Sequence, residues 1–450
     1  MSRISWDGYD AGVFRSRRSR LGRALGDLVA LIPAGMPRPR NYPANVHPFR
    51  AESHYLYLFG VPIAGAMGVV DGERAVLFVP PPEADAALWY GAIPSGGEIA
   101  ERAQVEVRPM DQLGQSISGR AVACVAVHDP VTDEAVRAAI GRRVDRDRLS
   151  PEDERLADAM VALRLIHDEA AIASIRRAAE ATTMAHRAGR LATRPGRTEV
   201  EVRAAMETEI VARGMTVAYP SIVTVHGEVL HNEARLEVIG DDDLLLADVG
   251  AESADGWASD VTRTWPASGV LSKTQHAIYE VVLDAQRTAI AMVRPGVRYR
   301  DIHLAASRRI AEGLVALGLL RGDVGEIVAD GVHALFFPHG VGHLLGLDVH
   351  DMEDLGDRAG YAPGRTRSEQ FGLRYLRLDR DLAPGMAVTI EPGIYFVPAI
   401  LDSPELAAVA GDRLVRSELA RFADVRGIRI EDDVLCTTGE PEVITAAIPK

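Results

Sequence analysis

Apolar and polar positions follow two different patterns along the chain. Up to about residue 150, short apolar runs separated by polar segments indicate an α/β module. We expect an arginine-rich helix at 14–28 and strands at 28–32, 65–70, 74–79 and 121–127. The charged stretch 141–155 is the best candidate for a connecting segment, because the composition changes across it. These patterns predict two domains, 1–160 and 161–450.

The second stretch repeats one order of elements. A helix predicted from Asp168 to about residue 191 stops at Arg194-Pro-Gly196, and a capping-box pattern at 198–201 starts the next helix. A helix predicted at 272–293 stops at Arg294-Pro-Gly296, and another follows at about 301–318. In each half, a segment containing histidine and then two strands bearing acids come next. We interpret this order as an internal duplication within a mixed α/β (α+β) chain.

Four acids stand at the ends of otherwise apolar strands. A carboxylate there is costly to bury unless it is paired or binds a cation. For any single acid, an exposed strand end or a salt bridge is the more common explanation. The matched positions in the two halves favour a shared site instead. The four acids are Asp248, Asp260, Glu391 and Glu431.

A glycine-rich segment at 337–351 carries His339, His343 and His350. On its own it could be a turn with solvated histidines. Together with the four acids, however, His343 completes a set of five oxygen and nitrogen donors without sulfur, which suits manganese, cobalt, iron or zinc. Carboxylates can bridge two such ions, and two adjacent ions activate a shared water and bind a carbonyl oxygen. The pattern therefore predicts hydrolytic chemistry.

Composition excludes several other classes of protein. The net charge of -14 argues against a nucleic-acid partner and against binding to an anionic membrane. Cys124 and Cys436 are the only cysteines, so no disulfide framework is expected. No apolar run is long enough to span a bilayer, and the N-terminus lacks the apolar core of a signal peptide. We therefore expect a cytoplasmic protein.

Four motifs resemble the signatures of one enzyme family. The segments 339–351, 260–264, 389–393 and 427–433 are similar to those of the pita-bread dinuclear metallopeptidases, in the branch of aminopeptidase P and prolidase. The resemblance extends from about residue 164 to 438. The front of the chain, at 48–60 and 88–91, is similar to the N-terminal domain of aminopeptidase P and the larger prolidases. It implies an N-terminal α/β domain followed by a pseudo-twofold pita-bread catalytic domain.

This resemblance also implies an activity. The enzyme would hydrolyse the bond between an N-terminal residue and proline with a water that bridges two metal ions. Manganese is the expected metal, with cobalt, zinc or iron as alternatives. An Xaa-Pro aminopeptidase is slightly favoured over an Xaa-Pro dipeptidase restricted to dipeptides. A metal-free binding protein or a metal-independent C–N hydrolase on the same fold is less favoured, because none of the five ligands is missing. A homodimer or homotetramer is expected.

The resemblance assigns roles residue by residue. It implies that Asp248, Asp260, His343, Glu391 and Glu431 hold the metals. Glu391 would also take the proton from the water, while His339 and His350 would hold the substrate carbonyl and the developing oxyanion, and His231 would line the proline side. We add Arg429 and Trp89 to the substrate-binding set, although Trp89 could equally pack in the core of its domain.

Some segments depart from the compact aminopeptidases. Asp248 and Asp260 are 12 positions apart, one more than in many relatives, and a hairpin turn at 253–256 can absorb the extra residue. The segments 368–380 and 398–426 look closer to prolidase. Within the first of them, Arg377 could bind the free carboxylate of a dipeptide through a bidentate pair, or it could be a structural arginine.

Overall fold

The computed structural model describes residues 11–232 and 237–450, and the chain divides into two units, Met1–Leu165 and Ile166–Lys450. In the described residues, no helix is long and apolar enough to cross a membrane.

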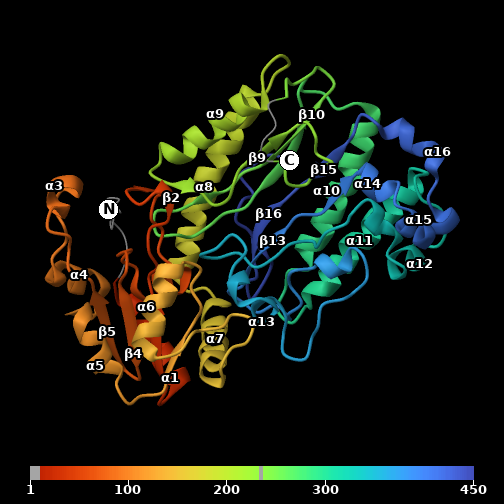
Figure 1. Cartoon of the computed structure of the whole chain (residues 1–450). Helices are drawn as coiled ribbons and strands as arrows, with labels where there is room; N and C mark the ends of the chain where they lie inside the picture. The colour runs from red at the N-terminus through yellow and green to blue at the C-terminus, as the bar shows by residue number, and fades with distance from the viewer. Residues whose placement is uncertain (1–10, 233–236) are drawn as a thin grey trace. The chain divides into compact units, whose positions relative to one another are not determined.

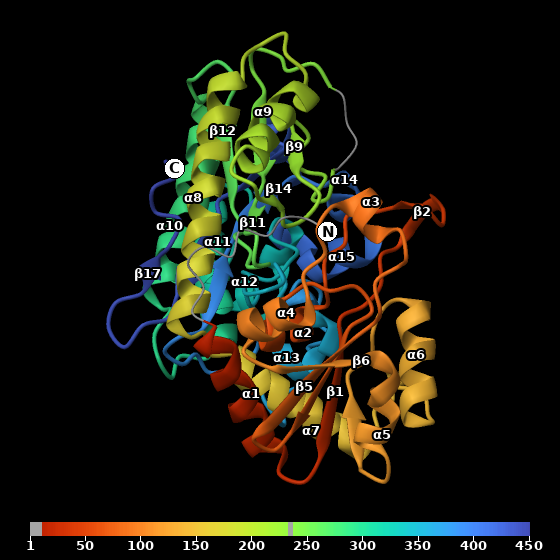
Figure 2. The ribbon, with the colours of Figure 1, turned by 90° about the vertical axis from the view of Figure 1, so that its left-hand side faces the viewer.

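The first unit is built on a five-stranded sheet with the strand order β6-β5-β4-β1-β7. Its strands are β1 (Val29–Pro33), β4 (Met67–Asp71), β5 (Arg74–Val79), β6 (Glu106–Pro109) and β7 (Val122–Cys124). Side chains alternate between its faces, because successive residues of a strand point to opposite sides. Val29 and Leu31 pack with Leu113, Ile117 and Val136 from the helices on one face. Figure 2 shows these helices, α5 and α6, on one side of the sheet and α1 and α7 on the other.

The remaining elements of this unit surround the sheet. They are α1 (Gly12–Leu25), α2 (Ser53–Phe59), α3 (Ala86–Tyr90), α4 (Gly96–Ala103), α5 (Leu113–Ile117), α6 (Pro130–Ile140), α7 (Pro151–Arg164) and a hairpin of β2 (Pro39–Tyr42) and β3 (Asn45–Val46). The predicted arginine-rich helix is α1, and the four predicted strands are β1, β4, β5 and β7.

The prediction of a connecting segment at 141–155 was wrong for residues 151–155. Residues 151–155 form the first turn of α7, because Ser150 caps the helix by accepting a hydrogen bond from the Asp153 backbone N–H, and Pro151 suits the first helical position. Asp153 is buried and also binds Arg142. The high charge of this stretch therefore reflects a helix N-terminus and an internal ion pair.

The second unit contains the repeated order of elements that the sequence predicted. Each half begins with a pair of packed helices and continues into a three-stranded sheet, and Figure 1 shows the helices running along the outside of the strands. The first half contains α8 (Glu169–Ala192), α9 (Glu199–Val211), β9 (Ile222–Thr224), β10 (Leu244–Asp248) and β12 (Thr262–Pro266). The second half contains α10 (Lys273–Ala291), α11 (Tyr299–Ala316), β13 (Ala387–Ile390), β16 (Asp432–Leu435) and β17 (Glu442–Val443).

The repeated Arg-Pro-Gly turns have the same structure. Gly196 and Gly296 both adopt positive φ, at 83° and 81°. Gly196 donates its backbone N–H to the Ile239 carbonyl, and Gly296 donates to the Leu382 carbonyl, both at 2.8 Å. Each acceptor lies shortly before a strand of the same half. The turn therefore fixes each helix pair against its own sheet, which supports the internal duplication.

Shorter elements complete the second unit. They are β8 (Thr216–Val217), β11 (Ala251–Glu252), β14 (Gly393–Tyr395), β15 (Gly427–Arg429), α12 (Val324–Ala329), α13 (Asp357–Gly360), α14 (Pro398–Leu401), α15 (Pro404–Ala410) and α16 (Arg416–Leu419), with 3₁₀ turns at 332–335, 353–355, 373–375, 411–413 and 420–422. The long segment 398–426 is thus largely helical.

The two halves meet through hydrogen bonds between β12 and the second half. The Glu431 backbone N–H donates to the Thr262 carbonyl at 3.0 Å, and the Thr264 hydroxyl donates to the Arg429 carbonyl at 3.0 Å. The start of β12 therefore lies beside the segment that joins β15 to β16.

Candidate metal centre

The four strand-end acids are placed by the repeated strands. Asp248 is the last residue of β10, and Glu391 directly follows the matching strand β13. Asp260 lies two residues before β12, and Glu431 directly precedes β16. The apolar runs pair within their sheets and leave the acids at the strand ends, so both halves present two carboxylates to the same region.

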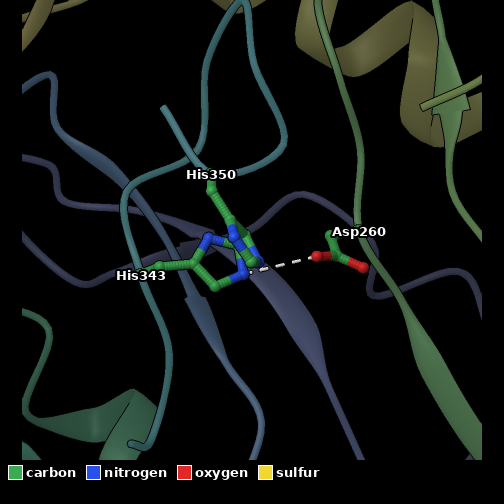
Figure 3. A group of neighbouring side chains, drawn as sticks. All are labelled: Asp260, His343 and His350. Atoms are coloured by element: carbon green, nitrogen blue, oxygen red, sulfur yellow. Dashed lines mark ion pairs between the residues drawn. The ribbon is translucent and has the colours of Figure 1, made fainter. Parts of the chain in front are cut away.

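Three groups of side chains bring ligand atoms within 4.8 Å of one another. They are Asp260–His343–His350, His343–Glu391–Glu431 and Asp248–Asp260–Glu431. Nε2 of His343 lies 3.4 Å from Oδ2 of Asp260 and 3.6 Å from Oε1 of Glu391. Donors that share one ion at about 2.1 Å are separated by roughly 3–4 Å, so these spacings suit a metal. Figure 3 shows the His343 ring turned toward Asp260, with His350 beside it.

The hydrogen bonds of the site leave the correct atoms available for a metal. Nδ1 of His343 lies 2.9 Å from the Leu344 carbonyl. Only a protonated nitrogen can donate there, so Nε2 carries the lone pair. Among the described residues, Oδ1 of Asp260 is buried without a hydrogen-bond partner. A buried orphan carboxylate oxygen is costly unless a cation binds it, so the site fits divalent ions.

Burial and mutual repulsion raise the pKa of these carboxyl groups. The pKa of Asp260 rises to about 7, first through burial and then through the charge of Asp248. The pKa of Glu391 also rises to about 7, and burial again is the main cause. The pKa of Glu431 rises well above its ordinary value through burial and the neighbouring acids. Such a concentration of negative charge is a favourable environment for divalent cations.

A buried arginine and a tyrosine hold Asp248 in place. Nη2 of Arg429 lies 2.5 Å from Oδ2 of Asp248, and the Tyr219 hydroxyl donates to Oδ1 at 2.7 Å. Arg429 also donates to Thr262 and to the Tyr395 hydroxyl. The structure therefore places Arg429 against the ligand residues, with its guanidinium already engaged by protein groups.

Two further residues orient the acids of the site. Asp433 accepts a hydrogen bond from the Ser259 hydroxyl at 2.7 Å and from the Asp260 backbone N–H at 3.1 Å. The Thr262 hydroxyl donates to Oε2 of Glu431 at 2.8 Å. These contacts fix the backbone at Asp260 and the carboxylate of Glu431, as outer hydrogen bonds do at metal sites.

His339 lies beside the acids with both ring nitrogens engaged. Nδ1 lies 2.7 Å from the Gly340 carbonyl, and Nε2 lies 2.8 Å from the Tyr395 hydroxyl. Burial lowers the pKa of His339 to about 3, so the ring is neutral. To hold a substrate carbonyl, His339 would have to exchange one of these contacts.

His350 lies between the acids of the site and the ion pair of Glu353 with Arg377. Its ring packs on His343, with centroids 4.1 Å apart. Nδ1 lies 3.2 Å from Oε2 of Glu353, whose carboxylate also accepts two hydrogen bonds from Nη1 of Arg377. Arg377, predicted to meet a substrate carboxylate, is thus paired with Glu353.

The other two predicted substrate residues lie in exposed positions. His231 is an exposed turn residue. Trp89 lies on α3 of the first unit with 73% of its surface exposed, which is contrary to packing in the core of that domain.

Close backbone approaches explain two glycines of the histidine segment. A Cβ at Gly342 would lie 2.2 Å from the Thr389 carbonyl oxygen, and one at Gly346 would lie 2.5 Å from the Asp351 carboxyl carbon. Side chains there would push β13 and the turn at 348–351 away from the site.

Several residues of the site were not singled out from the sequence. Thr262, Thr389, Tyr395 and Asp433 lie inside or beside the quoted motifs, so the motifs themselves carried a signal for them. Tyr219 stands alone in a segment without a motif, and Glu353 lies beside the motif 339–351, but only their contacts in the folded chain reveal their roles.

The chain matches two family descriptions. Residues 173–438 match metallopeptidase family M24, and residues 14–125 match the N-terminal domain of aminopeptidase P. The fold and the acid-rich site thus define a metal-dependent peptidase class. The chain belongs to metallopeptidase family M24 and is a hydrolase.

Curated and solved relatives cover most of the chain. An Xaa-Pro dipeptidase of Homo sapiens is 32% identical over 88% of this chain and 82% of its own length. A probable Xaa-Pro aminopeptidase of Fusarium vanettenii is 33% identical over 89% of this chain and 85% of its own length. The structure of aminopeptidase P from E. coli with the inhibitor Pro-Leu is 28% identical, with a TM-score of 0.79 over 98% of this chain and 96% of that chain.

Proposed function

We propose that this protein hydrolyses the peptide bond between an N-terminal residue and proline. The observation that carries the proposal is the convergence of the five predicted ligands, which come from both halves of the second unit and meet within metal-binding distance. The names of the relatives, an Xaa-Pro dipeptidase and a probable Xaa-Pro aminopeptidase, support the choice of substrate.

Two divalent ions would be held by the five ligands. They are Asp248, Asp260, His343, Glu391 and Glu431. Such a pair of ions supplies an activated water and polarises the carbonyl that is attacked. The all-oxygen-and-nitrogen donor set supports manganese as the metal, with cobalt, zinc or iron as alternatives.

The remaining side chains act on protons and on the substrate. Glu391, whose carboxylate lies among the ligands, takes the proton from the attacking water. His350 stabilises the developing oxyanion, and His339 holds the carbonyl of the scissile bond after its Nδ1–H turns away from the Gly340 carbonyl. His231 lines the proline side.

A dipeptidase is the second candidate, and Arg377 is the observation that favours it. Arg377 lines a cavity of about 130 Å³ together with His343 and His350. A guanidinium at that position would bind the C-terminal carboxylate of the proline in a dipeptide. An aminopeptidase needs the same region to accept a longer chain.

Substrates of different length distinguish the two activities. The manganese-loaded protein is assayed with Gly-Pro, Ala-Pro and Ala-Pro-Ala, and the released amino acids are quantified. We expect cleavage of all three by an aminopeptidase and of the dipeptides alone by a dipeptidase. If none is cleaved while two ions per chain are bound, the proposed substrate class is wrong.

We further propose a cytoplasmic homodimer or homotetramer that binds neither nucleic acid nor membranes. The net charge of -14 supports the exclusion of these two partners. Light scattering of the purified protein measures the number of subunits.

A further inference from the structure

Glu353 reaches His350 because of an unusual backbone turn. The Glu353 backbone N–H donates to the His350 carbonyl at 3.3 Å, and Met352, at the third position of this turn, adopts φ +60°. Glycine normally takes that position, because a side chain there is strained. Met352 is fully buried, so packing holds the strained turn in place. The turn directs the Glu353 carboxylate back toward the His350 ring.

Glu353 binds only one of the three donor groups of the Arg377 side chain. Nη1 of Arg377 contacts both carboxylate oxygens, at 2.7 and 2.8 Å. Among the described residues, Nη2 and Nε of Arg377 have no protein partner. Arg377 therefore keeps an edge that can bind a second carboxylate, while Glu353 neutralises its charge.

The other arginine of this cavity is already saturated. Arg367 forms an ion pair with Asp357 and donates to the carbonyls of Leu376 and Arg374, at 2.8 and 3.1 Å. Both pairs line the same cavity. Only the Glu353–Arg377 pair also contacts a histidine of the candidate metal centre.

We propose that Glu353 is a specificity-determining residue that sets how strongly the site prefers substrates in which proline carries the free C-terminal carboxylate. This inference rests on the proposed function. With Glu353 ionised, the pair with Arg377 is neutral, and a substrate carboxylate on Arg377 lies close to a like charge. Glu353 thereby weakens binding of dipeptides and leaves longer or amidated substrates unaffected.

The same carboxylate has a positioning role for His350. Because Oε2 of Glu353 accepts from Nδ1, it fixes the orientation of the ring beside Asp260 and His343. A change at Glu353 therefore alters turnover of every substrate equally, while only carboxylate-bearing substrates change in KM.

Glu353→Gln tests the proposal, because glutamine keeps the shape and an acceptor oxygen but removes the charge. Calorimetry with manganese-loaded protein measures Kd for L-proline and for L-prolinamide, and kinetics measure KM and kcat for Ala-Pro. We expect Kd for proline and KM for Ala-Pro to fall by about tenfold, and Kd for prolinamide to change less than twofold. Equal changes for proline and prolinamide, or none, would overturn the proposal.

Two further variants separate this effect from general charge. Asp357→Asn removes one negative charge from the same cavity without touching Arg377, and we expect both Kd values to change less than twofold. Arg377→Met is expected to abolish the difference between proline and prolinamide. A similar gain for proline in Asp357→Asn would assign the effect to the net charge of the cavity and overturn the specific role of Glu353.

Failure of the inference is distinguishable from failure of the proposed function. If the wild-type protein cleaves Ala-Pro and Glu353→Gln leaves the proline preference unchanged, only the role of Glu353 is wrong. If the wild-type protein cleaves no Xaa-Pro peptide, the proposed function itself is wrong. Metal content and thermal unfolding of each variant identify one that has lost its fold.

Discussion

Two proposed ligands of the metal centre, His343 and Asp248, are held by further contacts. His343 is fixed by the Leu344 carbonyl through Nδ1, and its backbone N–H donates to the Thr389 hydroxyl at 3.1 Å. Asp248 is held by Tyr219 and Arg429. Side chains fixed in this way lose little freedom when an ion binds, so the site is preorganised for metal.

Removing a ligand should abolish turnover and leave the fold intact. For Asp260→Asn and His343→Ala we expect activity to fall by at least about 1,000-fold, because activation of the water by metal is lost. Elemental analysis should show fewer ions per chain, and circular dichroism should be unchanged. Near-normal activity in either variant would mean that the ligand assignment is wrong.

His350→Ala should separate an oxyanion role from a ligand role. We expect turnover to fall by roughly 100-fold while metal content stays at the wild-type level, because His350 contacts the oxyanion and is not one of the five proposed ligands. A large loss of metal would make His350 a ligand, as its position beside Asp260 and His343 would also allow.

Asp433→Ala should weaken metal binding without removing a ligand. The backbone N–H of Asp260 and the hydroxyl of Ser259 would lose their acceptor, so we expect metal affinity to fall by about 10–100-fold in a competition titration with a chelator. Asp424→Ala is the control, because Asp424 accepts hydroxyl hydrogen bonds from Ser272 and Thr274 on the exposed surface. Equal losses in the two variants would contradict the positioning role.

At the scale of elements, a buried arginine joins β12 to β16. Arg263 forms an ion pair with Asp432 at 2.8 Å and donates to the carbonyls of Thr262 and Ile448. Asp432 is also paired with Lys450. Because Asp260 and Glu431 lie beside these two strands, this buried network holds ligands of both halves in register.

Arg263→Met should be strongly destabilising. It leaves Asp432 with one cation instead of two and removes several buried hydrogen bonds, so we expect the free energy of unfolding in urea to fall by about 3–5 kcal/mol. The control is Arg294→Met, whose ion pair with Glu440 is exposed, and we expect a far smaller loss of stability there. Comparable losses would mean that the network contributes no more than a surface pair.

The sequence predicted most elements of the second unit because their signals are local. The capping box at Thr198 forms as predicted, and α8 and α10 end just before the two Arg-Pro-Gly turns, as predicted. Strand-end acids could be matched between halves because the order of elements repeats. The contact of Glu353 with Arg377 could not be predicted, since it joins positions 24 apart through a turn with a strained methionine. Tyr219 could not be predicted for the same reason, because its role depends on a hydrogen bond to Asp248, 29 positions away.

At the scale of the whole molecule, the charge of the site links metal binding to pH. The raised pKa values of Asp260 and Glu391, both about 7, mean that these carboxyl groups hold protons at pH 6 that a metal must displace. In the unfolded chain both groups lose their protons near their ordinary values. The chelator-treated protein therefore loses stability as the pH rises through 7, because the folded state then carries the repelling charges.

Metal loading should accordingly strengthen with pH. We expect the apparent affinity of chelator-treated protein for manganese to rise by at least about tenfold between pH 6 and 7 and to level off by pH 8. The increase in Tm on adding manganese should be larger at pH 8 than at pH 6. An affinity that is flat or falls over this range would show that the carboxyl groups are ionised at pH 6.

Neither half of the second unit contains the complete set of ligands. The first half supplies Asp248 and Asp260, and the second supplies His343, Glu391 and Glu431, while the Glu431 backbone N–H bonds to Thr262 across the junction. Two separately produced fragments, divided between β12 and α10, would each be inactive alone. Mixed with manganese, they would recover activity only as they reassociate, which makes this enzyme a candidate for a split reporter of proximity.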